Sequence, residues 1–256
     1  MTRTSRALAI AAILTGPTAA LADVHVISSG GFTAAYKELV PACEAKIGQK
    51  VVSAYGASMG AAPDAIPQRL ARNEPADIVI LAGDAFDKLV ADGKGMAGTR
   101  TDLARSAIGL SVKSGAPKPD ISTVEALKKT LMEAKSIAYS ASASGTYLSE
   151  ELFPKLDPSG QVMAKSKKIF SERVGTVVAR GDAELGFQQV SELVPIAGLD
   201  FVGVLPDEVQ RVTVFSAGLA AGAKEPQAAK ALIACLGGAD AAETIRKTGL
   251  DPIPAK

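Results

Sequence analysis

Serine and glycine recur at points where an apolar, strand-like run passes into a helical pattern. The first free N–H groups of a helix, the positive end of its dipole and nearby serine hydroxyls all favour a negatively charged ligand. One such junction alone is better explained as an N-cap and a turn. Ligands of open α/β sheets collect at the carboxyl ends of strands, so several junctions together predict one shared site for an anion or a carboxylate. The four junctions read "ISSGGF", "YGASMG", "YSASASG" and "FSERVG".

The sequence lacks the residues that several other kinds of chemistry require. No Walker loop, no G-x-G-x-x-G and no G-x-S-x-G motif occurs, which argues against nucleotide binding and against a serine hydrolase. His25 is the single histidine, so neither a Ser-His-Asp triad nor a metal site of soft ligands is expected. We expect no cofactor. The 28 basic and 27 acidic residues nearly balance and no basic run occurs, so nucleic acid is not expected as a partner.

The N-terminal segment has the pattern of an export signal. Arg3 and Arg6 form a basic start, "ALAIAAIL" is a short apolar core, and "ALA" at residues 20–22 suits a signal peptidase. The apolar run is too short to span a bilayer, and no later run is long enough. We therefore expect residues 1–22 to be a signal peptide cleaved after Ala22, and a periplasmic protein with no membrane span, most simply a monomer.

Strand-like and helical segments alternate along the rest of the chain, which predicts an α/β fold with mainly parallel strands. No linker interrupts them, so two domains would be joined by strands, with "SAIGLSV" and "RVTVFSAG" as the crossings. We expect one lobe from residues 23–106 with 215–256, a second from 107–214, and the cleft between them. The expected strands are "VHVISS", "KVVSAYG", "ADIVILAG", "SAIGLSVKSG", "SIAYSA", "AELGFQQ", "DFVGVLP" and "RVTVFSAGLAAG". The expected helices cover residues 33–46, 64–72, 85–92, 123–134, a run from about 145, 172–180 with Ser171 as N-cap, and 226–248.

Two cysteines, Cys43 and Cys235, lie on expected helices near opposite ends of the chain. In an exported protein an even pair permits a disulfide, which would place both chain ends in one domain. Two buried free thiols are an equal alternative, because cysteine is a common small core residue.

The motifs "VISSGGFTAAYKEL", "GASMG", "EPADIVILAGD", "ARGDAELGF" and "VGVLPDEVQ", spread over nearly all of residues 24–215, resemble those of the periplasmic molybdate-binding proteins of ABC transporters. The resemblance implies a type II periplasmic-binding-protein fold, in which two α/β lobes joined by crossing strands close on an oxyanion. It also implies that serine hydroxyls and helix N-terminal amides hold the ligand. If the chain is a transport protein, an ABC permease is the expected partner.

One departure from that family concerns the end of the strand "ELGFQQ", where a typical molybdate binder has tyrosine and this chain has Gln189. An amide both donates and accepts, unlike a single hydroxyl donor, which suggests a larger organic anion. With "SSGGF" and "YSASASG", this strand resembles the exported branch that includes aconitate isomerases. That resemblance implies an isomerase acting on a small tricarboxylate, interconverting trans- and cis-aconitate. A binding protein without catalysis, for molybdate or another oxyanion, and a sensory binding module remain the alternatives.

An allylic proton shift needs a group to take a proton, a group to return it, and donors for the developing charge. The candidate catalytic residues are Tyr147, Ser144 and Glu192, although each also suits a cap, a packing residue or a hinge contact. Arg69, Arg105 and Arg173 are the candidate cations for the carboxylates, with surface or structural roles as the alternative for Arg69 and Arg105. The full set of candidate ligand contacts is Ser28, Ser29, Gly30, Ser58, Met59, Arg69, Arg105, Ser142, Ser144, Arg173, Val174, Gln188 and Gln189.

Overall fold

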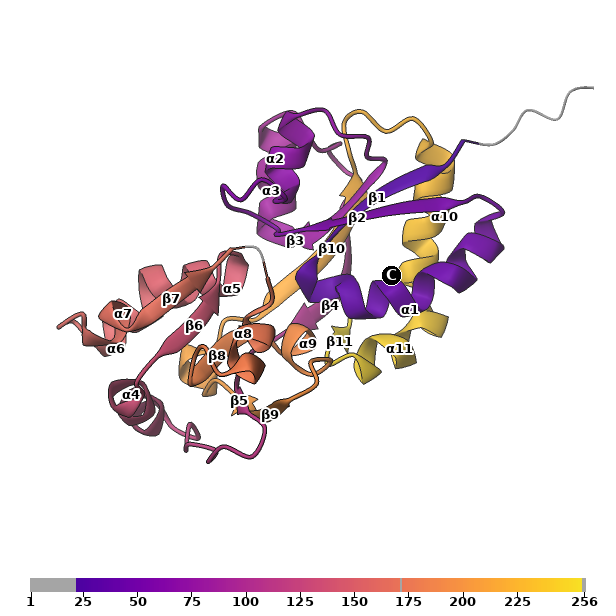
Figure 1. Ribbon diagram of the computed structural model, residues 1–256. Helices are drawn as coiled ribbons and strands as arrows, with labels where there is room; N and C mark the ends of the chain where they lie inside the picture. Colours follow the sequence, from indigo (N-terminus) through magenta and orange to yellow (C-terminus); the bar gives the residue numbers. More distant parts are fainter. Residues whose placement is uncertain (1–21, 171, 255–256) are drawn as a thin grey trace, which may run out of the picture.

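The computed structural model describes residues 22–170 and 172–254, which form two β-sheets with helices packed on their faces (Figure 1). The first sheet has the strand order β11-β4-β10-β3-β1-β2, in which β1 pairs in parallel with β2 and β3 while β10 runs antiparallel. Its strands are β1 (Val24–Ser29), β2 (Val51–Gly56), β3 (Ile78–Ala82), β4 (Thr101–Ser106), β10 (Thr213–Leu219) and β11 (Asp251–Pro252).

Helices cover both faces of this sheet. On one face the core joins the strands to α1 (Gly30–Ile47), α10 (Pro226–Leu236) and α11 (Ala242–Lys247). On the other face it joins them to α2 (Ile66–Ala71) and α3 (Gly83–Ala91). The central strand β3, "IVILA", is buried along its whole length, as an apolar run covered on both faces should be.

The second sheet has the order β7-β6-β8-β5-β9, in which β6 pairs in parallel with β7 and β8, and β5 is antiparallel to β8 and β9. Its strands are β5 (Ile108–Lys113), β6 (Ile137–Ser140), β7 (Ser166–Ile169), β8 (Leu185–Gln189) and β9 (Leu199–Val204). Its helices are α4 (Val124–Glu133), α5 (Ala143–Tyr147), a π-helical turn (Leu148–Leu152), α6 (Phe153–Leu156), α7 (Gln161–Ala164), α8 (Val174–Arg180), α9 (Val190–Leu193) and a 3₁₀ turn (Asp207–Val209).

The chain passes between the two sheets twice. The strand predicted over residues 106–115 corresponds to β5 of the second sheet, and the unpredicted strand β4 of the first sheet precedes it, with Ala107 between them. The return runs from β9 to β10 through residues 205–212. Neither glycine nor proline marks the first crossing, so the sequence does not reveal that the pairing partners change at residue 107.

Several other elements differ from the prediction. The closing helix expected over residues 226–248 is broken after Leu236, because Gly237 and Gly238 end α10 and a 3₁₀ turn (Ala239–Ala241) precedes α11. The strands β4, β7 and β11 were not predicted; β7, "SKKI", is too polar to be recognised as a strand. Helix α1 begins at Gly30, three residues before the predicted start, so both glycines belong to its first turn.

A disulfide joins Cys43 on α1 to Cys235 on α10, with a Cα–Cα distance of 5.8 Å and a sequence separation of 192 residues. Of the two alternatives for the cysteine pair, the structure therefore has the bond. It ties an early helix to a late one on the same face of the first sheet, so residues from both ends of the chain share one core.

Residues 1–21, which include most of the predicted signal peptide, lie outside the described residues, as does Ser171. In the parts of the chain that the structure describes, no helix combines the length and apolar character needed to cross a membrane.

Candidate functional site

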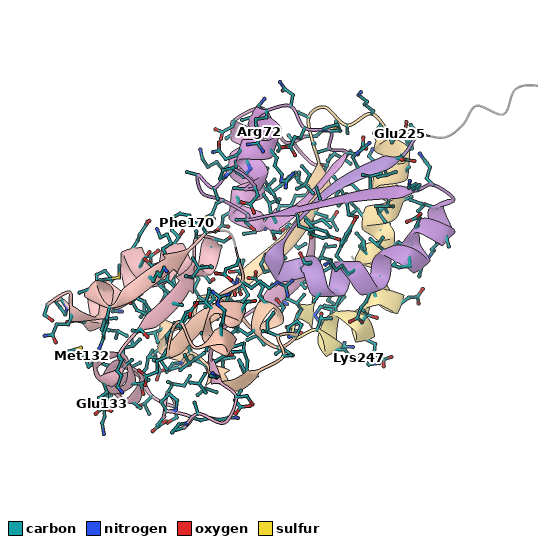
Figure 2. The ribbon with its side chains drawn as sticks, in the orientation of Figure 1. Arg72, Met132, Glu133, Phe170, Glu225 and Lys247 are labelled. Atoms are coloured by element: carbon teal, nitrogen blue, oxygen red, sulfur yellow. A yellow bond between two sulfur atoms is a disulfide. The ribbon has the colours of Figure 1, made fainter. Side chains whose placement is uncertain are left out.

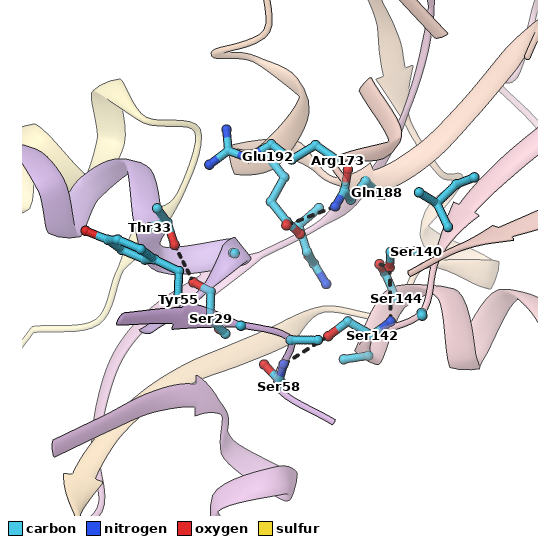
Figure 3. A pocket seen from close by; sticks show the side chains of 18 of the residues that line it. Ser29, Thr33, Tyr55, Ser58, Ser140, Ser142, Ser144, Arg173, Gln188 and Glu192 are labelled. Carbon is cyan, nitrogen blue, oxygen red and sulfur yellow. Dashed lines mark hydrogen bonds between the residues drawn. The ribbon is translucent and has the colours of Figure 1, made fainter. Parts of the chain in front are cut away.

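A cleft of about 300 Å³ lies between the carboxyl ends of strands from the two sheets, and several of the predicted junctions meet there (Figure 3). We use the name "the cleft" for this cavity and the residues that line it. Its lining consists of Ser29, Gly30, Gly31, Thr33, Lys37, Tyr55, Gly56, Ala57, Ser58, Asp64, Ser140, Ala141, Ser142, Ala143, Ser144, Ile169, Phe170, Glu172, Arg173, Gln188, Gln189, Glu192 and Phe215.

The first junction presents a buried hydroxyl and a helix start. Ser29 is 1 % exposed, and its Oγ has no hydrogen-bond partner among the described residues. It is the N-cap of the 18-residue helix α1, yet its side chain makes no capping bond. Thr33 Oγ1 donates to the Ser29 carbonyl at 2.8 Å instead. A buried hydroxyl without a partner, beside helix N–H groups, is the arrangement that an anionic ligand would complete.

Two glycines are needed here because other groups approach the backbone closely. A β-carbon on Gly30 would lie 2.1 Å from Glu192 Oε1, and one on Gly31 would lie 2.0 Å from the Phe215 ring. The glycines therefore bring the start of α1 against a carboxylate from the second sheet and an aromatic ring from β10.

The second and third junctions touch each other across the cleft. The Ser58 N–H donates to Ser142 Oγ at 3.3 Å, and Ser58 Oγ accepts from the Ala82 N–H at 3.0 Å. Ser140 Oγ and Ser144 Oγ lie 3.1 Å apart and share a hydrogen bond. These hydroxyls already have partners within the protein, which distinguishes them from Ser29.

The second sheet and its helices contribute an acidic side chain, Glu192, which is hydrogen-bonded to Gln188. Gln188 on β8 accepts from the Val174 N–H through Oε1 at 3.0 Å, and donates through Nε2 to Glu192 Oε1 at 2.9 Å. Figure 3 shows Arg173, Gln188 and Glu192 together on this side of the cleft. Burial raises the pKa of the Glu192 carboxyl to about 7, while the charge of Arg173 and the bond from Gln188 act in the opposite direction. A carboxyl with a pKa near neutral can both take and return a proton.

Nine of the predicted residues line the cleft: Ser29, Gly30, Ser58, Ser142, Ser144, Arg173, Gln188, Gln189 and Glu192. Gln189 is held at the strand crossing. In the orientation that satisfies both ends of its amide, the oxygen accepts from Thr213 Oγ1 at 2.9 Å and the nitrogen donates to Ser106 Oγ at 2.9 Å. The amide is thus used mainly to fix the crossing strands.

Two predicted cations do not line the cleft. Arg69 pairs with Glu74 at 2.6 Å and donates to the Asp64 carbonyl at 3.0 Å, so its guanidinium is engaged by residues on either side of helix α2 in the sequence. Arg105 lies on β4, half exposed, 3.9 Å from Asp251 of the neighbouring strand β11. Arg69 follows the second junction and Arg105 precedes the first crossing in sequence, but sequence order does not show the direction of either side chain.

Four further predicted residues also lie outside the lining. Ser28 Oγ donates to the Ser29 carbonyl at 3.3 Å, and Met59 packs against the core around α2 and α3. The Val174 N–H is taken by Gln188, so it is not free for a ligand. The Tyr147 hydroxyl donates to the Val209 carbonyl at 2.8 Å, which places it in the packing of the second sheet and not at the site.

Sequence reasoning missed several lining residues, among them Thr33, Lys37, Tyr55 and Phe170. Lys37 lies one helical turn after Thr33 on α1, and its Nζ is 4.8 Å from the centre of the Tyr55 ring. Residues four apart lie on the same face of a helix, so the position of Thr33 after the first junction could have indicated Lys37. Phe170 is 57 % exposed at the rim of the cleft (Figure 2), where no periodic pattern marks it. Among the described residues, no cluster of three or more His, Cys, Asp or Glu side chains could hold a metal ion.

The model of the bacterial extracellular solute-binding protein family matches residues 24–251. The chain belongs to this family. It also shares 48 % identity over 254 residues, which cover 97 % of each chain, with an aconitate isomerase from a Pseudomonas species.

Solved structures of periplasmic binding proteins agree with the fold of this family member. A periplasmic molybdate-binding protein from Azotobacter vinelandii superposes with a TM-score of 0.69 at 20 % identity, covering 91 % of this chain and 100 % of that one. A sulfate-binding protein from Mycobacterium tuberculosis H37Rv gives 0.71 at 19 % identity, covering 90 % and 87 %. At these identities the likeness establishes the fold alone, which is the predicted two-sheet α/β architecture of periplasmic binding proteins.

Proposed function

We propose that this protein is an exported aconitate isomerase that interconverts trans- and cis-aconitate in the cleft. The observation that carries the proposal is the 48 % identity, over nearly the whole of both chains, with a protein that is an aconitate isomerase. The cleft supports it independently, because it combines anion-binding groups with a buried carboxyl whose pKa is raised to about 7.

The substrate itself explains why one acid–base centre suffices. The central carbon of aconitate bears a carboxylate and joins a methylene carbon to a vinyl carbon, each bearing one carboxylate. Moving a proton from the first flanking carbon to the second restores the same constitution, so only the geometry of the double bond changes. Glu192 is the group we assign to this proton transfer, with no cofactor, while Ser29 Oγ and the first N–H groups of α1 bind a carboxylate of the substrate.

Two cations are the candidates for binding the remaining carboxylates. Arg173 lines the cleft from the start of α8 and Lys37 from α1, on opposite sides. Among the described residues neither forms an ion pair, unlike Arg69 and Arg105. We therefore assign Arg173 and Lys37 to the substrate.

The second candidate is a transport-linked binding protein for a small oxyanion or carboxylate, which passes its ligand to an ABC permease without chemistry. Membership of the solute-binding family favours it. In either case we propose a small anionic ligand, a monomer, a signal peptide cleaved after Ala22, and two lobes formed by residues 23–106 with 215–256 and by residues 107–214.

The test incubates the purified protein with trans-aconitate and separates the isomers by chromatography between pH 6 and 9. We expect conversion toward an equilibrium that is the same from either isomer. Thermal shift with aconitate, citrate, sulfate and molybdate follows the ligand class, because a ligand that binds the native state stabilises it. If the protein converts no aconitate at high protein concentration and only molybdate stabilises it, the protein is a transport-linked binding protein instead.

A further inference from the structure

Gln188 connects a backbone amide to the proposed acid–base residue. It is 4 % exposed, near the end of β8, and its amide uses both ends within the protein. Oε1 accepts from the Val174 N–H at 3.0 Å and Nε2 donates to Glu192 Oε1 at 2.9 Å. The two bonds join α8, β8 and α9 through one side chain.

The orientation of this amide follows from its partners. A backbone N–H donates and never accepts, so Gln188 must turn its oxygen to Val174. Its NH₂ group then faces Glu192, where it can only donate. Glu192 Oε1 is therefore held as a hydrogen-bond acceptor.

The start of α1 also lies close to the same oxygen. A β-carbon on Gly30 would lie 2.1 Å from Glu192 Oε1 but 3.7 Å from Oε2, so Oε1 rests against the glycine backbone. The two oxygens thus differ: Oε1 accepts from Gln188 and lies close to Gly30, whereas Oε2 has no hydrogen bond among the described residues.

We propose that Gln188 is a positioning residue that fixes Glu192 so that Oε2, and not Oε1, exchanges the proton with the substrate. This proposal rests on the proposed isomerase function. Oε2 takes a proton from the methylene carbon, and the electron pair of that C–H bond forms the new double bond. The pair of the old double bond passes to the former vinyl carbon and its carboxylate, and this carbon then receives a proton from Oε2, which leaves all charges as they began.

A pH test of this proposal depends on the groups that shift the pKa of Glu192. Arg173 and Glu172 lie at the start of α8, Lys37 on α1 and Asp64 ahead of α2, all lining the cleft. The bond from Gln188 favours the charged form of Glu192 and so lowers its pKa, against the larger effect of burial. Loss of this bond should raise the pKa further.

The experiment measures kcat and KM against pH for the wild type and for Gln188→Met, which keeps the shape and removes both bonds. We expect the acid limb of kcat/KM, near pH 7 in the wild type, to move up by about one pH unit. We expect kcat at neutral pH to fall about ten-fold or more, and KM to change less than three-fold because the amide is spent within the protein. Gln188→Glu still accepts from Val174 but adds a negative charge beside Glu192, so it should move the acid limb in the same direction. This second variant keeps the proposal testable if Gln188→Met does not fold.

Gln161→Met is the matched control, because Gln161 is exposed on α7; its profile should equal that of the wild type. A second readout needs no turnover: the ¹³C signal of the Glu192 carboxyl, assigned by its absence in Glu192→Gln, gives the pKa directly. If the wild type converts no aconitate, the isomerase function fails while this titration still tests Gln188. Equal Glu192 titration in the wild type and in Gln188→Met would overturn the positioning role.

Discussion

The two sides of the cleft are built in opposite ways. The first wall, from the six-stranded sheet, consists of Ser29, Gly30 and Gly31, which are consecutive in sequence and open one long helix. The second wall, from the five-stranded sheet, consists of Gln188 and Glu192 with Arg173, which come from three different elements. The first wall holds a buried hydroxyl without a partner among the described residues; in the second wall, Gln188 and Glu192 already bond to each other.

This difference separates binding from chemistry. Unpaired donors at a helix start have most to gain from a ligand carboxylate, because the ligand supplies the missing acceptor. A carboxyl fixed by an internal hydrogen bond is held in one orientation before the ligand arrives, as proton transfer requires. We therefore assign substrate binding mainly to the first wall and proton transfer to the second, and three substitutions test that assignment.

Glu192→Gln should have the largest effect, because it removes the proposed acid–base group and keeps its shape. We expect kcat to fall by roughly 10² to 10⁴, with aconitate still raising the melting temperature. The matched control is Glu133→Gln, on the exposed face of α4 away from the cleft (Figure 2). A rate within a few-fold of the wild type would remove Glu192 from the chemistry.

The same variant makes a prediction about stability. The pKa of Glu192 in the folded state, about 7, lies above its ordinary value of 4.5. Between these two values the folded protein holds a proton that the unfolded chain has lost, so the wild type loses stability as pH rises from 4.5 through 7. Glutamine has no such cost, and the melting temperature of Glu192→Gln relative to the wild type should increase over that range.

The sequence reveals the first wall more readily than the second for a physical reason. "SSGGF" contains the whole first wall within one local pattern, so strand, turn and helix start can be read together. The bond between Gln188 and Glu192 spans four residues across the end of β8, and its anchor at Val174 depends on how α8 packs. Glu192 was a candidate by residue type, but no pattern in the sequence places it against Gly30 or sets its burial.

The errors among the cations have the same origin. Arg69 and Arg173 both lie close behind serine-rich junctions, yet Arg69 pairs with Glu74 while Arg173 lines the cleft. Helix α2 is six residues long and follows a long turn, so the rotation of its faces cannot be counted from the junction. On α1, which starts directly at the junction, counting would have worked and would have found Lys37.

Gly30→Ala tests the point where the two walls touch, and its effect should be intermediate. The added methyl group would overlap Glu192 Oε1, so the carboxyl must move or the helix start must shift, at a cost of about 1–3 kcal/mol. We expect kcat to fall about ten-fold or more together with a lower melting temperature. Gly222→Ala is the control, because a β-carbon there meets nothing within 4 Å. Unchanged kinetics in Gly30→Ala would mean that Glu192 does not need its present position.

Ser29→Ala should have the smallest effect and the most selective one. Its Oγ has no partner among the described residues, so its loss should leave the melting temperature of the free protein unchanged or slightly higher. Affinity for aconitate, measured by calorimetry, should fall about ten-fold, because one hydrogen bond to a charged ligand is lost.

Ser111 is also buried without a partner among these residues but lies on β5 outside the cleft lining, so Ser111→Ala should leave affinity unchanged. Ser144→Ala, which breaks the bond to Ser140, should instead lower the melting temperature of the free protein. If Ser29→Ala destabilised the free protein and spared affinity, as a structural serine would, the first wall would not be the binding wall.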